Sequence, residues 1–198
     1  MARGDTAYSN LALPAHTDNT YFVGVVICVS VFLILVRTQT DPCGIQIFHL
    51  LEHTDGTGGA SLLVDGFYAA SILRDLYPEA YSLLSTIPIA THAAGEAGTF
   101  YRATHSSLEH DAAGNLKAVR WNNDDRSTLR GVPYSDVPRL YEAMRTWNEL
   151  ITSQDSEYWV QLAPGTAVGM TVLTFPFFVS CDCTRDDEIA RLTHSYSV

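Results

Sequence analysis

The tripeptide His16-Thr17-Asp18 constrains the fold of this chain more than any other stretch. Side chains alternate between the two faces of an extended strand, so an imidazole and a carboxylate two residues apart point the same way there. Such a pair supplies two ligands of a 2-His-1-carboxylate site, which holds Fe(II) and leaves positions open for a co-substrate and O2. We therefore expect residues 5–22 to lead into an iron-binding strand. A lone H-x-D is more often two surface polar residues, so the wider sequence must separate the two interpretations.

The composition favours one globular domain and argues against a nucleic-acid surface. A chain of 198 residues with 46% hydrophobic residues can bury a core. Acidic residues outnumber basic ones, 22 to 12, whereas a nucleic-acid surface needs a basic patch. The four cysteines form no C-x-x-C pair, which argues against structural zinc, and residues 1–12 lack the apolar region of a signal peptide. A reducing compartment is expected.

Further motifs occur in a definite order along the chain. Asp5-Thr6-Ala7-Tyr8 precedes His16, and three stretches follow it: Asp41 to His49, Gly56 to Phe67, and Asn122-Asn123-Asp124-Asp125-Arg126. Together they resemble the trimethyllysine dioxygenases, relatives of γ-butyrobetaine dioxygenase in the taurine-dioxygenase-like group of Fe(II)/2-oxoglutarate oxygenases. The resemblance runs from about Asp5 to Val168 with one interruption.

This resemblance implies a fold and a reaction. The expected fold is α+β, a partial double-stranded β-helix of the jelly-roll or cupin type with flanking helices, and residues 1–198 would form a single, incomplete oxygenase domain. The implied reaction is hydroxylation of N6,N6,N6-trimethyllysine in carnitine biosynthesis, with Fe(II), 2-oxoglutarate as co-substrate and ascorbate as reductant. The expected partner is this small molecule, without nucleic acid or membrane, and a homodimer is left open. The expected compartment is cytoplasmic, with mitochondrial as the alternative.

The resemblance also assigns roles to individual residues. His16 and Asp18 would bind iron, and Ser61 would help to hold 2-oxoglutarate. Tyr8 would contact the trimethylammonium group through its ring, a contact that needs no hydrogen bond, or else be an ordinary packed tyrosine. Asn122 and Asn123 match a motif near the substrate carboxylate, without showing which of them contacts it.

An uncharged run from Val23 to Val36 interrupts the resemblance. A transmembrane helix needs ~20 apolar residues, and a buried strand usually has about 4–8. The third interpretation is a retained intron, because in the family Tyr-Phe is followed almost at once by the acidic turn seen here as Asp41-Pro42-Cys43-Gly44. Val23 fits a GT donor and Gln39 a CAG acceptor. We expect residues 23–40 to lie outside the barrel, with Phe22 and Asp41 close in space.

After Val168 the resemblance fails. The family continues into a segment that carries the distal His ligand and then the Arg that pairs with 2-oxoglutarate, but residues 169–180 contain neither His nor Arg. We therefore interpret residues 169–182 as aberrant, and His194 is the only later histidine. Two further readings follow: a catalytically inactive form of the fold, and a small membrane-anchored protein built around residues 23–36.

Periodicity predicts the remaining elements. Helices are expected near residues 66–77, 79–85 and 137–151, and strands at 45–49, 61–64, 116–121, 158–162 and from 166. Asp136 is the expected N-cap of the third helix. The expected buried stripes are Phe67, Ile72, Leu73 and Leu76 on the first helix and Val137, Leu140, Tyr141, Met144, Trp147 and Ile151 on the third. Residues 92–115 are weakly patterned and predict a loop containing His92, His105 and His110.

Overall fold

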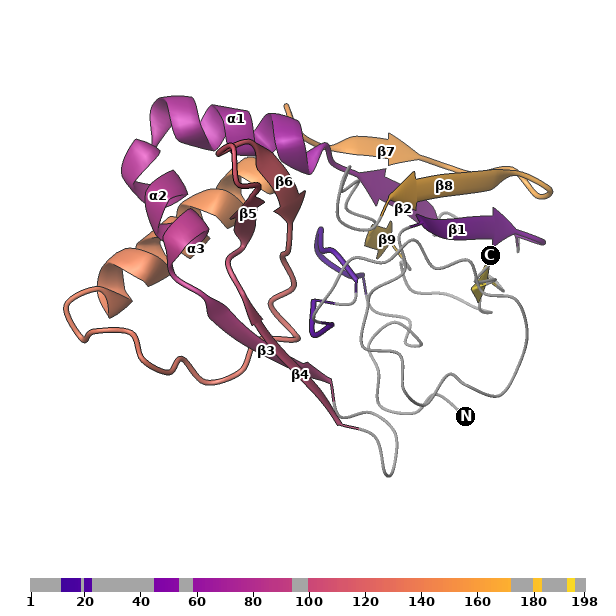
Figure 1. Ribbon diagram of the computed structural model, residues 1–198. Coiled ribbons are helices and arrows are strands. Elements are labelled where there is room, and N and C mark those ends of the chain that lie inside the picture. The colour runs from indigo at the N-terminus through magenta and orange to yellow at the C-terminus, as the bar shows by residue number, and fades with distance from the viewer. Residues whose placement is uncertain are drawn as a thin grey trace.

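The computed structural model describes residues 12–18, 20–22, 45–53, 59–93, 100–171, 180–182 and 192–194. Within it, strands from the earlier part of the chain pair with strands from the later part. One antiparallel sheet has the order β10-β1-β8, and a second has the order β7-β2-β9. Their bounds are β1 Ile45–Leu50, β2 Ala60–Leu63, β7 Tyr158–Val160, β8 Ala167–Thr171, β9 Ser180–Asp182 and β10 Leu192–His194. The expected strands at 45–49, 61–64 and 158–162 are thus confirmed (Figure 1).

Two antiparallel hairpins stand beside these sheets. The first joins β3 Ile89–Ala93 to β4 Tyr101–His105, and the second joins β5 Leu108–His110 to β6 Leu116–Val119. The prediction of a loop over residues 92–115 was therefore wrong, since three strands lie within or overlap that range. Ile89, Thr91 and Ala103 are buried on one side of the first hairpin. Packing against distant parts of the chain therefore stabilises these strands, although the local sequence shows no clear strand pattern.

Three helices pack together on one side of the molecule, next to β5 and β6 (Figure 1). Helix α1 spans Gly66–Leu76, and the Asp65 carboxylate caps it by accepting hydrogen bonds from the backbone N–H groups of Phe67 and Tyr68, both at 3.0 Å. Pro78 ends that helix and opens α2, Pro78–Thr86, where a missing N–H costs nothing. Helix α3 spans Val137–Ile151 as predicted.

Asp136 occupies the N-cap position of α3 as predicted, although its side chain makes no capping hydrogen bond and instead pairs with Arg139 at 3.1 Å. The predicted burial of Tyr141 and Leu76 was wrong. Tyr141 is 49% exposed and its ring lies under the guanidinium of Arg126, while Leu76 is 64% exposed at the end of α1. The inner face of α1 is instead formed by Ala69, Ala70 and Leu73, which are buried.

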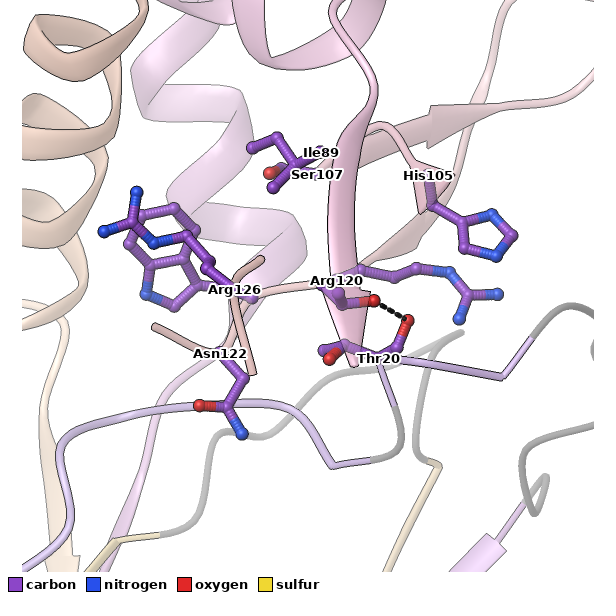
Figure 2. A pocket seen from close by; sticks show the side chains of 9 residues that line it. Thr20, Ile89, His105, Ser107, Arg120, Asn122 and Arg126 are labelled. Carbon is purple, nitrogen blue, oxygen red and sulfur yellow. Dashed lines mark hydrogen bonds between the residues drawn. The ribbon is translucent and has the colours of Figure 1, made fainter. Parts of the chain in front are cut away.

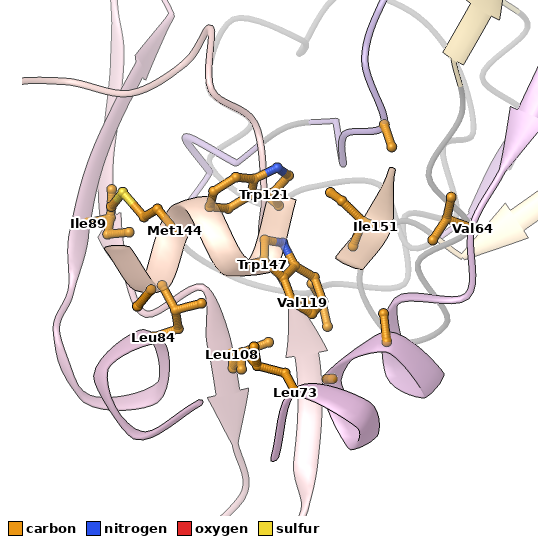
Figure 3. Close-up of a cluster of buried hydrophobic side chains, with 14 of the residues drawn as sticks. Val64, Leu73, Leu84, Ile89, Leu108, Val119, Trp121, Met144, Trp147 and Ile151 are labelled. Atoms are coloured by element: carbon orange, nitrogen blue, oxygen red, sulfur yellow. The ribbon is translucent and has the colours of Figure 1, made fainter. Parts of the chain in front are cut away.

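Trp147 lies at the centre of the core between α3 and the hairpins (Figure 3). Its side chain is fully buried, and its ring meets that of Trp121 edge to face at 6.4 Å. Leu73 from α1, Leu84 from α2 and Leu108 from β5 are buried in the same cluster. Trp121 directly follows the β6 hairpin, so this core fixes the segment that leads away from β6.

Two sets of predictions fall outside the described residues: those on Tyr8 and those on residues 23–40 with Asp41. In the part of the chain that the structure does describe, no helix is long and apolar enough to cross a membrane.

We expect Trp147→Ala to lower the free energy of unfolding by about 3–5 kcal/mol, because the substitution leaves a large cavity in the core. Urea denaturation followed by circular dichroism measures this loss. Tyr134→Ala is the matched aromatic control, since Tyr134 is 97% exposed and its removal should change stability little. Equal stability of the two variants would contradict the core described above.

Candidate functional site

The side chains of His16 and Asp18 converge as the tripeptide predicts. His16 Nε2 lies 3.3 Å from Asp18 Oδ1, and Thr17 between them points the other way and is buried. The backbone here is irregular rather than a strand of a sheet, so the prediction of an iron-binding strand was wrong for residues 12–18. Side chains still alternate in direction along this segment although it is not part of a sheet, and this alternation brings His16 and Asp18 together.

The tautomer of His16 is set by its own backbone. Its Nδ1 lies 2.8 Å from the carbonyl oxygen of Pro14, which can only accept, so Nδ1 carries the proton and Nε2 is the atom left to ligate. Burial lowers the pKa of His16, but the hydrogen bond and charge of Asp18, the Pro14 carbonyl and the charge of Asp125 together raise it above its ordinary value. The neighbouring carboxylate therefore favours the protonated imidazole more than an ordinary histidine environment does.

Hydrogen bonds of Thr17 hold this tripeptide against the chain just after β6. Its backbone N–H donates to the carbonyl of Trp121 at 2.7 Å, and the backbone N–H of Trp121 donates back to Thr17 Oγ1 at 2.8 Å. Both residues are buried, at 3% and 4% exposure. A pair of hydrogen bonds between buried groups leaves neither backbone amide unsatisfied, so the position of the tripeptide is tied to the core through Trp121.

Thr20 makes a second attachment to the same segment. Its hydroxyl donates to Asp125 Oδ2 at 2.5 Å, and its backbone carbonyl accepts a hydrogen bond from Thr91 Oγ1 at 3.0 Å, drawn as the dashed line in Figure 2. Burial raises the pKa of Asp125 to about 6, against the lowering effect of the Thr20 hydroxyl, and the charge of Asp18 raises it further. Asp125 thus lies within electrostatic range of the His16–Asp18 pair.

A pocket adjoins this attachment (Figure 2). Its wall is formed by residues from the tripeptide's segment, β3, β4 and the chain around β6: Thr20, Ile89, Thr91, His105, Ser107, Arg120, Trp121, Asn122 and Arg126. The Arg120 side chain is 4% exposed; its Nε pairs with Glu109 Oε1 at 2.6 Å and its Nη1 donates to the carbonyl of Phe22 at 3.1 Å. Burial raises the pKa of Glu109, but His105 and Arg120 bring it below its ordinary value overall.

The other predicted site residues lie in separate places. Ser61 is half-buried on β2, opposite Val160 of β7. Asn122 lines the pocket, and its side-chain oxygen accepts a hydrogen bond from the backbone N–H of Asp124 at 3.0 Å, whereas Asn123 is exposed. His92, His105 and His110, expected in a loop, belong to strands β3, β4 and β5.

Sequence reasoning missed Thr17, Thr20, Trp121 and Asp125. Asp125 stands inside the Asn-Asn-x-x-Arg motif, which was the one available signal. The hydrogen bonds that give these residues their importance join positions 104 and 105 residues apart, and no local pattern marks such a pairing.

The side chains of His16 and Asp18 are suited to supply two ligands to one divalent metal ion. A neutral imidazole nitrogen and a carboxylate oxygen are ligands that Fe(II) accepts in a 2-His-1-carboxylate site. Among the side chains that the structure describes, no group of three His, Cys, Asp or Glu residues converges, so the described residues offer two protein ligands.

Comparison with known proteins identifies the family. The model of the taurine catabolism dioxygenase TauD, TfdA family matches residues 37–170, more than half of the chain. The chain therefore belongs to this family. The matched range begins after the His16–Asp18 pair and ends shortly after Val168.

Within this family, the chain is similar to trimethyllysine dioxygenases and to a gamma-butyrobetaine dioxygenase. Mitochondrial trimethyllysine dioxygenase of Bos taurus is 40% identical over 208 residues, which covers 97% of this chain and 45% of the relative. Trimethyllysine dioxygenase of Neurospora crassa is 39% identical over 83% of this chain and 39% of the relative. Human gamma-butyrobetaine dioxygenase is 28% identical over 64% of this chain and 33% of the relative. The chain thus spans less than half the length of these relatives.

Solved structures agree on the fold. A protein assigned as an alpha-ketoglutarate-dependent taurine dioxygenase from Burkholderia xenovorans superposes with a TM-score of 0.58 at 13% identity, over 85% of this chain and 52% of its own. PvcB from Pseudomonas aeruginosa gives a TM-score of 0.50 at 14% identity, over 89% of this chain and 56% of its own. The mixed helix and strand architecture expected from the sequence is confirmed at this level.

The raised pKa of Asp125 predicts a pH-dependent stability. The folded protein holds this proton up to about pH 6, whereas the unfolded chain releases it near 3.8, so the stabilising contribution of Asp125 is complete below pH 4 and is lost as the pH rises to 6. Relative to the unchanged chain, Asp125→Asn should therefore become progressively more stable from pH 4 to 6. Melting temperatures in EDTA measure the difference, with the exposed Asp155→Asn as control. A constant difference across this range would contradict the assignment.

Glu109→Gln should lower the free energy of unfolding by roughly 3–5 kcal/mol, because it leaves the buried Arg120 guanidinium without its carboxylate. Glu79→Gln is the control, since Glu79 and its partner Arg139 are 69% and 53% exposed and screening by water makes that pair weak. Urea denaturation at neutral pH compares the two. A loss no greater for Glu109→Gln than for Glu79→Gln would show that Arg120 finds other support.

Proposed function

We propose that this chain carries the iron-binding part of an oxygenase that hydroxylates N6,N6,N6-trimethyllysine in carnitine biosynthesis. The observation that carries the proposal is the convergence of His16 Nε2 and Asp18 Oδ1 at 3.3 Å, with His16 held in the tautomer that leaves Nε2 to ligate. The names of relatives about 40% identical, trimethyllysine dioxygenases, support the choice of substrate. Fe(II) together with 2-oxoglutarate would supply the oxidising chemistry.

The chain's own residues would bind and orient the reactants. His16 and Asp18 would hold Fe(II), Ser61 would help to hold 2-oxoglutarate, and Asn122 or Asn123 would contact the substrate carboxylate. Tyr8 would take the trimethylammonium group against its ring. Ascorbate would act as reductant, keeping the iron in its ferrous state. The net charge of −10 suits a cationic small molecule as the partner.

The finer architecture that we propose is a partial double-stranded β-helix in a single, incomplete oxygenase domain over residues 1–198. The antiparallel sheets β10-β1-β8 and β7-β2-β9, each built from early and late strands, support this arrangement. Residues 23–40 would be an insertion and residues 169–182 an aberrant segment. A homodimer is compatible with this arrangement. The mammalian relatives are named mitochondrial, which supports the mitochondrial alternative over the cytoplasmic one.

A second candidate is a catalytically inactive form of the same fold. It is favoured by one observation: residues 169–180, where the family carries its distal His and the Arg that binds 2-oxoglutarate, contain neither residue type. Loss of a metal-ligating imidazole weakens metal binding, and loss of the Arg removes a charge-assisted contact that orients a carboxylate.

One assay separates the two candidates. Succinate and hydroxytrimethyllysine are measured with Fe(II), ascorbate and 2-oxoglutarate, for the chain as it stands and for a repaired version. The repair removes residues 23–39, restores the relatives' His- and Arg-bearing segment after Val168, and supplies their N-terminal portion. We expect turnover by the repaired version, abolished by His16→Ala, and no coupled turnover by the chain as it stands.

Two results would contradict these expectations. Robust turnover by the unrepaired chain, abolished by His16→Ala, would show that another residue completes the site, with His194 the first to test. A repaired version that folds but forms no hydroxytrimethyllysine would refute the proposed substrate.

A further inference from the structure

The segment that carries His16 and Asp18 is docked on residues 121–125 by two hydrogen-bonded attachments. The first joins Thr17 to Trp121, and the second joins Thr20 to Asp125. Asp18 lies between the two threonines, so its backbone is held on both sides. Thr17 and Thr20 are 3% and 2% exposed, so water competes less for these bonds than it would at an exposed site.

Asp125 is itself held rigidly. Its backbone carbonyl accepts a hydrogen bond from the backbone N–H of His92 in β3 at 2.8 Å. The neighbouring turn is closed by the bond from the Asp124 N–H to the Asn122 side chain. These bonds fix the backbone around Asp125, and its carboxylate accepts the hydrogen bond that holds Thr20.

Asp125 is also close enough to the pair for its charge to matter. Its carboxylate oxygen lies 2.5 Å from the hydroxyl of Thr20, two residues after Asp18, and besides burial the charge of Asp18 also raises the pKa of Asp125. In a partly buried site a negative charge at this range favours a divalent cation, because the effective dielectric constant is well below that of water.

We propose that Asp125 is a positioning residue of the iron site: it fixes the turn after Asp18 through the Thr20 hydroxyl, and its negative charge favours a divalent cation on His16 and Asp18. This inference rests on the proposed function, because it assumes that His16 and Asp18 bind the metal. It adds an outer partner that the tripeptide does not contain.

Binding of Co(II), an air-stable probe for the Fe(II) site, tests the inference in the full chain. Asp125→Asn keeps an oxygen for the Thr20 hydroxyl but removes the charge, whereas Thr20→Val removes the hydroxyl and keeps the shape. Loss of an outer partner commonly costs about 10–100-fold in metal affinity, and we expect a rise in Kd of that size for both variants. Thr20→Ser restores the hydroxyl and should restore binding. Asp111→Asn removes a carboxylate from the tip of the β5–β6 hairpin and should bind as the unchanged chain does.

Two readouts distinguish positioning from simple unfolding. The visible absorption of bound Co(II) reports the ligand environment and should change in Asp125→Asn and Thr20→Val but not in Thr20→Ser. Circular dichroism in EDTA at neutral pH should show an intact fold for Asp125→Asn, whose substitution removes a buried charge.

The outcomes separate the inference from the proposed function. If Asp125→Asn and Thr20→Val bind Co(II) as the unchanged chain does, while His16→Ala has lost binding, the positioning role is refuted and the iron site stands. If the unchanged and His16→Ala chains bind equally, or neither binds, the iron site is refuted and the inference with it.

Discussion

The reciprocal hydrogen bonds between Thr17 and Trp121 are the interaction on which the rest of the site depends. They close a loop of 104 residues at a buried point, where both partners would otherwise leave an amide unsatisfied. The Trp121 ring also packs against Trp147 of α3, so the same residue belongs to the hydrophobic core and to the site. The geometry of His16 and Asp18 is therefore a consequence of core packing, although neither side chain is part of the core.

Local patterns predicted local structure well. The helices predicted near residues 66–77, 79–85 and 137–151 are α1, α2 and α3, and Leu140 and Trp147 are buried on α3 as the apolar spacing predicted. The pairing of His16 with Asp18 followed from side-chain alternation alone. The predictions that failed concern features set by distant neighbours: the strands around His92 and His105, and the exposure of Tyr141, whose ring lies under Arg126. Hydrogen bonds such as Thr20 to Asp125 leave no periodic trace in a sequence.

The electrostatics of the site describe a protein prepared for a cation. His16 Nε2 lies 3.3 Å from Asp18 Oδ1, and the Asp18 carboxylate raises the pKa of the imidazole, while Asp125 adds a further acidic group in a partly buried setting. A metal on Nε2 needs the neutral imidazole, so metal binding at this atom depends on pH. The acidic groups that raise the pKa of His16 are the same ones whose charge a metal ion would neutralise.

The buried Arg120 guanidinium donates a hydrogen bond to the carbonyl of Phe22, and this contact holds Phe22 in place. A change of length in the chain after Phe22 meets this hydrogen bond before it reaches Thr20. Residues added after Phe22 are thus compatible with unchanged positions of His16 and Asp18 before it. The contact between Arg120 and Phe22 thus separates the chain after Phe22, where length can vary, from the segment before it, where the geometry of His16 and Asp18 must be kept.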